Sequence, residues 1–239
     1  MSLARRRIWS VLGMVCLTAI GCTRSEPPAP EVSEPYVPVV WPPDLGSIEV
    51  PLEENLLRKN YYIVFDGSGS MSGEKIRAAK QALETFVAEI PDDSHVGLFV
   101  FDDAIQSERA PLGSSRQTIL GQIGNVVAGG GTPLTSSIGV AYHKLLEKGH
   151  RQLGYGEYTI VVVTDGRAND ASALQDAING ILRESPVVIY TIGFKIGARH
   201  TLNQPGRTIY RAANDLDELT AALQDVLAEA EDFTVLDFE

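Results

Sequence analysis

Continuous apolar runs that alternate with helical patterns are the feature of this sequence that most limits its fold. Residues 61–65 and 158–164 are apolar almost throughout, without the alternation of polar and apolar residues that a half-exposed strand shows. Strands of this kind are buried on both faces, as in a parallel sheet. Between them, apolar residues recur every three or four positions, which predicts amphipathic helices. The sequence therefore predicts an α/β fold that is doubly wound, with a mostly parallel central sheet flanked by helices.

The predicted elements follow one another from residue 61 to residue 230. Strands are expected at 61–65, 95–101, 104–110, 158–164, 187–192 and 208–210. Helices are expected at 76–90, 119–126, 138–145, 174–181 and 216–230. The short run 104–110 is expected at an edge of the sheet. Because ligands of such folds bind beyond the carboxyl ends of the strands, the residues that follow the strands are the candidates for function.

The first 21 residues have the pattern of a secretion signal. Three arginines at 5–7 precede an apolar stretch, Ile8–Ile20, that is too short for a transmembrane helix. The segment 19–22 resembles the lipobox of bacterial lipoproteins, in which the cysteine is acylated and begins the mature chain, although Ala19 stands where Leu is usual. We expect a lipoprotein signal peptide at 1–21 and a lipid anchor on Cys22. The alternative is an ordinary cleaved signal.

A lipid on Cys22 implies membrane attachment in the cell envelope. Thr23 stands where lipoproteins of the inner membrane often have Asp, so the outer membrane is favoured. Seven of the 13 prolines lie within 23–45, which indicates an extended spacer. We therefore expect a Pro-rich tether at 22–57, one domain at 58–231 and a C-terminal tail at 232–239.

Charge and cysteine content exclude several classes of function. The formal charge is −11, and removal of 1–21 leaves 17 basic and 31 acidic residues, a charge of −14. No nucleic-acid binding is expected, because that function needs a basic surface to neutralise phosphates. Two cysteines are too few for a disulfide framework or a four-cysteine zinc site.

The segment 66–75, which follows the first predicted strand, does not match the common phosphate and nucleophile motifs. Glu74 follows Gly73 where a P-loop needs Lys, and Ser72 stands where the dinucleotide pattern needs its last glycine. Neither Ser68 nor Ser70 has glycine two positions away on both sides, as a nucleophile elbow requires. A serine nucleophile is therefore not expected.

Oxygen ligation of a hard dication fits this segment better. Asp66, Ser68 and Ser70 alternate, so a tightly curled loop can direct one carboxylate and two hydroxyls at one point, with Gly67 and Gly69 allowing a strained backbone. Asp165 follows the most apolar strand and supplies a second carboxylate. Thr132 lies on a glycine-rich loop, 129–134, that can approach closely.

The pattern of these five residues resembles the metal-ion-dependent adhesion site of the von Willebrand factor A family, in the bacterial branch of that family. The family pattern is Asp-x-Ser-x-Ser after the first strand, a distant Thr, and an Asp after the fourth strand; the matching residues are Asp66, Ser68, Ser70, Thr132 and Asp165. The resemblance spans about 58–230. It implies that the first and fourth strands are neighbours, and that the site binds Mg²⁺ or Mn²⁺, with Ca²⁺ less favoured.

The resemblance also implies a non-enzymatic module whose metal accepts a carboxylate from Asp or Glu of a protein partner. Two alternatives stay open: a structural domain whose metal fastens loops, and a metal-dependent hydrolase, which needs a positioned base. Taken singly, Asp66 and Asp165 are also typical helix N-caps, and Thr132 a typical turn residue.

Other candidates carry weaker signals. The histidines at 95, 143, 150 and 200 show no ligand spacing and are expected at the surface or at strand ends. Asp102 and Asp103 are expected in a turn. The basic segment 195–207 is interpreted as a solvated loop, with a recognition patch as the alternative.

Overall fold

The fold is seen in a computed structural model that describes residues 40–46, 49–166, 168–198 and 200–231. The expected signal peptide, Cys22, the first part of the expected tether and the expected tail lie outside these residues. Six strands form one sheet: β1 Lys59–Asp66, β2 His95–Phe101, β3 Gln106–Ala110, β4 Glu157–Thr164, β5 Val188–Phe194 and β6 Ile209–Ala213. The helices are η1 Gly69–Met71, α1 Glu74–Glu89, α2 Arg116–Gly124, α3 Leu134–Arg151, α4 Ala171–Glu184 and α5 Leu216–Glu231.

The strand order of the sheet is β3-β2-β1-β4-β5-β6. All neighbouring strands run parallel except β2 and β3, which pair antiparallel at the edge. This confirms the predicted doubly wound α/β fold and the edge position of β3. Because β1 and β4 are neighbours with the same direction, Asp66 and the residue after Thr164 lie at the same edge of the sheet.

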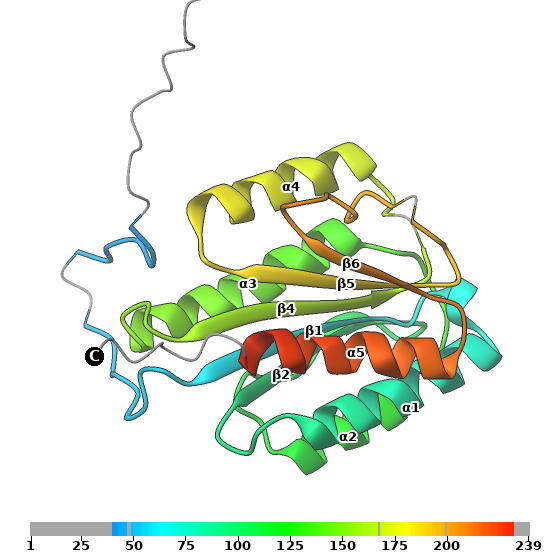
Figure 1. Ribbon diagram of the computed structural model, residues 1–239, viewed down its shortest axis with the longest axis horizontal. Helices are drawn as coiled ribbons and strands as arrows, with labels where there is room; N and C mark the ends of the chain where they lie inside the picture. Colours follow the sequence, from blue (N-terminus) through cyan, green and yellow to red (C-terminus); the bar gives the residue numbers. More distant parts are fainter. Residues whose placement is uncertain (1–39, 47–48, 167, 199, 232–239) are drawn as a thin grey trace, which may run out of the picture. The chain divides into compact units, whose positions relative to one another are not determined.

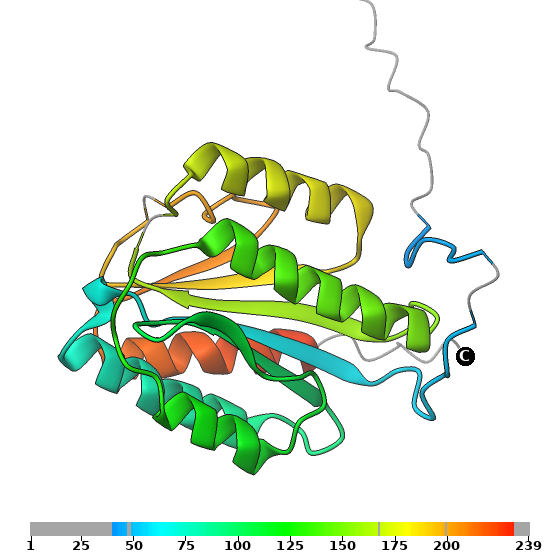
Figure 2. The same cartoon turned by 180° about the vertical axis from the view of Figure 1, so that it is seen from behind.

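Helices cover both faces of the sheet, so each strand contributes to two cores. Alternate residues of β1 point to opposite faces. Tyr61, Ile63 and Phe65 pack in the core beneath α1, α2 and α5. Tyr62 and Val64 pack in the core beneath α3 and α4. Figures 1 and 2 show the two groups of helices on opposite sides of the sheet. Full burial of such side chains contributes about 1.5–3 kcal/mol each and explains why the strands are apolar throughout.

Part of the expected tether lies against the domain. Trp41 packs on Tyr158 with ring centroids 4.5 Å apart, at an interplanar angle of 65°. A Cβ added to Gly149 of α3 would lie 2.4 Å from the Trp41 ring, so only glycine leaves room for it. Further along the chain, Lys148 Nζ donates to Glu53 Oε1 over 2.7 Å. At Trp41 and Glu53, the expected tether thus makes contacts typical of a folded domain.

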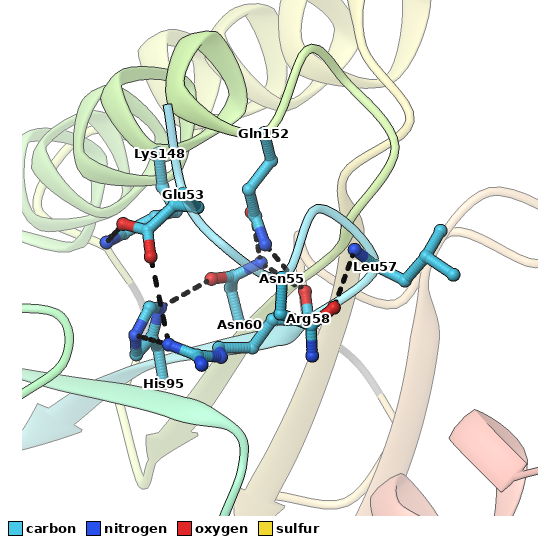
Figure 3. A network of polar contacts seen from close by, with 8 residues as sticks. All are labelled: Glu53, Asn55, Leu57, Arg58, Asn60, His95, Lys148 and Gln152. Atoms are coloured by element: carbon cyan, nitrogen blue, oxygen red, sulfur yellow. Dashed lines mark hydrogen bonds and ion pairs between the residues drawn. The ribbon is translucent and has the colours of Figure 1, made fainter. Parts of the chain in front are cut away.

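A buried polar network fixes this segment at the amino ends of β1 and β2 (Figure 3). Arg58 Nη1 donates to His95 Nε2 over 2.7 Å, so the imidazole carries its proton on Nδ1, which faces Asn60 Oδ1 at 3.3 Å. Asn60 Nδ2 in turn donates to Gln152 Oε1 over 2.8 Å. Burial, followed by the charges of Lys148 and Arg58, lowers the pKa of His95 to about 4. The network lies at the edge of the sheet opposite to Asp66.

Within the part of the chain that the structure describes, no helix has both the length and the apolar character that crossing a membrane requires.

Candidate metal centre

Asp66 is the last residue of β1, and it is fully buried. Its Oδ1 accepts a hydrogen bond from the backbone N–H of Ser68 (2.8 Å), and its Oδ2 accepts one from Thr164 Oγ1 (2.5 Å). Burial raises the pKa of Asp66, although these hydrogen bonds oppose the effect by favouring the charged form. The N-cap of α1 is Gly73, so Asp66 does not cap that helix.

The two serines connect Asp66 to the loop after β4. Ser68 Oγ lies 3.1 Å from Ser70 Oγ, and Ser70 Oγ donates to Asp165 Oδ1 over 2.6 Å. Asp165 is also nearly buried, at 5% exposed. The N-cap of α4 is Asp170, so Asp165 is not a helix cap either. The alternating residues after β1 and the first residue after β4 therefore direct their oxygens into one cluster, as the sequence predicts.

Position 67 requires glycine because its neighbours pack closely, and not because its backbone conformation is strained. The described glycines with positive φ do not include Gly67 or Gly69, so the expected strained backbone is wrong for both. A Cβ on Gly67 would lie 2.8 Å from Val126 Cγ1 and 2.9 Å from Asp102 Cβ, too close for any larger residue. The small size of Gly67 thus lets the loop after β1 lie against the neighbouring loops.

Thr132 approaches the cluster from the loop between α2 and α3. A Cβ placed on Gly166 would lie 3.4 Å from Thr132 Oγ1 and 3.8 Å from Asp66 Oδ2, so both oxygens lie beside Gly166. The Thr132 carbonyl also accepts a hydrogen bond from the backbone of Asn169 (3.3 Å), which joins this loop to the one after β4. Thr132 does not cap α3, whose N-cap is Pro133.

Backbone hydrogen bonds hold the glycine-rich loop against the loop after β1. Gly69 N–H donates to Gly130 O over 3.2 Å, and Gly129 N–H donates to Gly67 O over 2.8 Å. Gly130 has a φ of +71°, a conformation that side chains rarely adopt. The position of Thr132 is therefore set by main-chain contacts that depend on glycine.

Lys75 is a site residue that the sequence analysis missed. It is the second residue of α1, and its ammonium group contacts Asp165 Oδ2. The Asp165 side chain has no exposed surface, whereas that of Lys75 is 29% exposed. In the sequence, Lys75 is marked only by its position directly after Glu74. This position does not predict a contact with a residue 90 positions away.

Asp102 does more than occupy the expected turn. It is buried, its Oδ1 accepts from the backbone of Ala104 (3.1 Å), and the same atom pairs with Arg109 Nη2 at 2.8 Å. Its Oδ2 accepts from the backbone of Val127 over 3.4 Å. Asp102 thus fixes the turn after β2 against the segment that leads into the glycine-rich loop.

His200 is buried, and the expectation of a surface or strand-end position is wrong for it. Its Nδ1 accepts from the backbone of Leu202 (3.1 Å), so Nε2 carries the proton and donates to Gly166 O over 2.8 Å. Its ring stacks on Tyr210, which buries it further. The bond to Gly166 ties the basic segment 195–207 to the loop that carries Asp165. His95, the first residue of β2, is at a strand end as expected.

The donor set fits a small divalent cation. Two carboxylates and three hydroxyls are oxygen ligands of the kind that Mg²⁺ prefers, and Mg²⁺ usually keeps several waters as well. The contact between the Lys75 ammonium and Asp165 shows that a positive charge is accepted at this position. Among the described residues, no group of three or more His, Cys, Asp or Glu side chains gathers in a metal-binding arrangement. The candidate centre therefore depends on its hydroxyl donors in addition to Asp66 and Asp165.

A family model of the von Willebrand factor type A domain matches residues 60–231, and the chain belongs to this family. Domains of this family are generally non-enzymatic adhesion or scaffold modules. Among curated proteins, the inter-alpha-trypsin inhibitor heavy chain H1 of Mesocricetus auratus is 25% identical over 149 residues. The match covers 58% of this chain and only 16% of that protein.

Solved structures show the same fold at low sequence identity. The vWF domain of the type V pili tip protein Mfa5 from Porphyromonas gingivalis is 11% identical, with a TM-score of 0.61; the match covers 76% of this chain and 99% of that chain. The manganese-loaded TRAP protein of Plasmodium vivax is 19% identical, with a TM-score of 0.53, and the match covers 70% and 72% of the two chains. These similarities establish the fold that positions the candidate centre.

Proposed function

We propose that this protein is a metal-dependent protein-binding module of adhesion or scaffold type, and not an enzyme. Asp66, Ser68, Ser70, Thr132 and Asp165 hold one divalent cation at the carboxyl ends of β1 and β4. When bound, the cation supplies a Lewis-acidic position that accepts the carboxylate of an Asp or Glu side chain from a protein partner. The role of the chain's own residues would be to hold and orient the cation.

The observation that carries this proposal is the convergence of side-chain oxygens from three separate loops. A continuous series of short contacts runs from Ser68 through Ser70 to Asp165. Thr132 Oγ1 and Asp66 Oδ2 both lie within 4 Å of a Cβ placed on Gly166. Burial and the charge of Asp165 both disfavour the charged form of Asp66, so a divalent cation held by these residues would add stabilisation beyond that of the Lys75 ion pair with Asp165.

Mg²⁺ or Mn²⁺ suits the site better than Ca²⁺. Mg²⁺ needs about six oxygens at short distance, and one or two carboxylates with hydroxyls and waters meet that need. Ca²⁺ takes six to eight ligands at longer distance and is usually held by more carboxylates and carbonyls. The manganese-loaded state of the TRAP protein supports a transition-metal or magnesium ion in a domain of this fold.

The two other functions lack specific support. A hydrolase needs a general base near the bound metal, but His200, which bonds to the residue after Asp165, has both ring nitrogens engaged by backbone atoms. A metal that only fastens loops is less favoured, because main-chain bonds already join the loop after β1 to the glycine-rich loop.

The lipid anchor on Cys22 extends the proposal to the cell envelope, with the outer membrane favoured. The amino end of β1, with the segment at 53–58, lies at the edge of the sheet opposite to Asp66. Strand β1 has eight residues, which at about 3.3 Å per residue separates the two edges by roughly 26 Å. The segment at 53–58 thus leads into the domain at the edge of the sheet remote from the candidate metal centre.

The experiment is a binding assay with the mature protein immobilised and solubilised envelope proteins as the source of partners. It is done with Mg²⁺, with chelator, and with Mg²⁺ plus excess free glutamate. Asp66→Asn is the test variant, and Asp103→Asn, which changes an exposed aspartate of the neighbouring turn, is the matched control.

We expect a defined set of partners that is retained with Mg²⁺ by the wild type and by Asp103→Asn. The same set is lost with chelator and in Asp66→Asn, and is reduced by glutamate. Partners that bind equally in chelator and in folded Asp66→Asn would overturn metal-bridged recognition and favour a structural role of the domain.

A further inference from the structure

Lys75 places a positive charge inside the candidate metal centre. Its ammonium group forms an ion pair with Asp165 Oδ2, while Ser70 Oγ donates to the other oxygen, Oδ1. Both oxygens of this buried carboxylate are therefore already engaged, one by a hydroxyl and one by a cation. A metal ion that binds Asp165 must share it with Lys75 or displace the ammonium group.

The position of Lys75 in α1 is electrostatically unfavourable for a lysine, apart from the ion pair with Asp165. It is the second residue of α1, where the positive end of the helix dipole repels a cation. The first residue, Glu74, is directed to solvent, with its side chain 86% exposed. Helix electrostatics thus favours an acidic residue at position 75, and the ion pair with Asp165 is the interaction that compensates for lysine there.

We propose that Lys75 is a built-in competitor of the metal that sets the metal affinity of this site. This inference rests on the proposed function, because it concerns the same centre. Without a divalent ion, the ammonium group neutralises Asp165 and stabilises the metal-free centre. With the ion bound, Lys75 opposes it by charge repulsion and so lowers its affinity.

The positive charge of Lys75 also favours binding of the partner's carboxylate. Two carboxylates balance one divalent ion, so without Lys75 the loaded centre is neutral. With Lys75 nearby, the loaded centre carries a net positive charge of about one. A carboxylate from a partner is then attracted by an excess of charge, in a protein whose surface is otherwise strongly acidic. Lys75 therefore lowers the affinity of the centre for the metal and raises the affinity of the loaded centre for the partner's carboxylate.

The movement that this role requires is small. The Lys75 side chain is 29% exposed, so its ammonium group can turn into solvent by rotation of side-chain bonds alone. Asp165 itself has no exposed side-chain surface and stays in place. The exchange between the two cations at Asp165 needs no rearrangement of β4 or α1.

The test measures Mn²⁺ binding to the full mature protein by the electron paramagnetic resonance signal of free Mn²⁺. Lys75→Met keeps the length of the side chain and removes its charge. Lys75→Arg keeps the charge. Lys80→Met is the matched control on the same helix, because Lys80 Nζ donates to the exposed carbonyl of Gly124 away from the site. Circular dichroism confirms that each variant is folded.

Lys75→Met is expected to bind Mn²⁺ about tenfold more tightly than the wild type, since a unit charge a few ångströms away is removed from a partly buried site. Lys75→Arg and Lys80→Met are expected to stay within about twofold of the wild type. In chelator, Lys75→Met should melt a few degrees lower than the wild type, because the buried carboxylate of Asp165 loses its counter-ion.

The outcomes separate this inference from the proposed function. Wild-type binding with unchanged or weaker binding in Lys75→Met overturns the inference and leaves the metal site intact. Binding in Lys75→Met but not in the wild type supports competition by Lys75 and overturns metal dependence of the native chain. Absence of Mn²⁺ binding in both proteins overturns both proposals.

Discussion

At the scale of single residues, Asp66 meets two opposing demands. As a ligand of the proposed metal it would have to be charged, but it is fully buried, and burial raises its pKa. The N–H of Ser68 and the hydroxyl of Thr164 partly offset this cost by donating to its two oxygens. Without a divalent ion, the charged carboxylate therefore destabilises the domain at neutral pH.

Replacement of this carboxylate by an amide should stabilise the metal-free protein. Because the folded-state pKa of Asp66 is raised, its contribution favours the fold below the unfolded-state pKa and is lost as the pH rises through the folded-state pKa. At pH 7 in chelator, Asp66→Asn is expected to melt roughly 2–4 °C higher than the wild type, as measured by calorimetry. A lower melting temperature would show that the hydrogen bonds to the carboxylate outweigh its burial.

The contribution of His95 to the stability of the domain depends on pH in the opposite sense to that of Asp66. Its pKa is lowered from 6.5 to about 4, so the unfolded chain binds a proton at a higher pH than the folded domain does. Its contribution is complete above pH 6.5 and is lost as the pH falls toward 4. Between pH 6.5 and pH 4, we expect the free energy of unfolding to fall by about 1–2 kcal/mol more in the wild type than in His95→Gln.

Urea denaturation at several pH values measures this difference. Glutamine at position 95 can still accept the hydrogen bond from Arg58 but does not titrate. His143→Gln, at an exposed position of α3, is the control and should follow the wild type. Parallel stability curves for wild type and His95→Gln would contradict the role of the network in Figure 3.

At the scale of elements, α3 carries two glycines with different surroundings. Gly149 lies under Trp41, and an added Cβ would be 2.4 Å from the indole ring. Gly139, in the same helix, has nothing within 4 Å of an added Cβ. Helix propensity alone favours alanine over glycine by up to about 1 kcal/mol at both positions.

We therefore expect Gly139→Ala to stabilise the domain by roughly 0.5–1 kcal/mol. Gly149→Ala should instead destabilise it, because the methyl group displaces Trp41 from its contact with Tyr158. Once residues 1–21 are removed, Trp41 is the single tryptophan of the chain, so its fluorescence should shift to the red in Gly149→Ala only. Equal effects of the two substitutions would contradict the docking of the segment that begins at Trp41.

Most elements could be predicted because their apolar spacing is read directly from the sequence. The strand predicted at 95–101 agrees with β2 at both ends. The helix predicted at 138–145 extends over Leu134–Arg151, because its outer turns carry polar residues that leave no periodic signal. The contact of Trp41 with Tyr158 joins residues 117 positions apart, and local patterns carry no information about it.

The candidate site was predictable to the same degree. Asp66, Ser68 and Ser70 follow a strand at regular spacing, and Asp165 follows the next strand in the sheet, so the topology alone brings them together. Lys75 and His200 reach the site through side-chain contacts whose partners are distant in sequence. Pattern and composition could not identify these two.

At the scale of the whole molecule, the two edges of the sheet have different roles. The amino edge is closed by the docked segment and the buried network around Asn60. The carboxyl edge carries the oxygen cluster on three loops. Under the proposed function, the charge of −14 left after removal of residues 1–21 would repel acidic partners at long range, whereas a bound cation would attract a carboxylate only within about one Debye length, roughly 8 Å at physiological salt. The proposal therefore requires direct contact between the partner's carboxylate and the metal.

A calorimetric titration of the mature protein with Mg²⁺ and Mn²⁺ decides whether the carboxyl edge holds a metal. We predict one ion per chain for the wild type and for Asp103→Asn, and no detectable binding for folded Asp66→Asn. A wild type that binds neither ion at millimolar concentration, or an Asp66→Asn variant that binds them as the wild type does, would contradict the metal centre at the ends of β1 and β4.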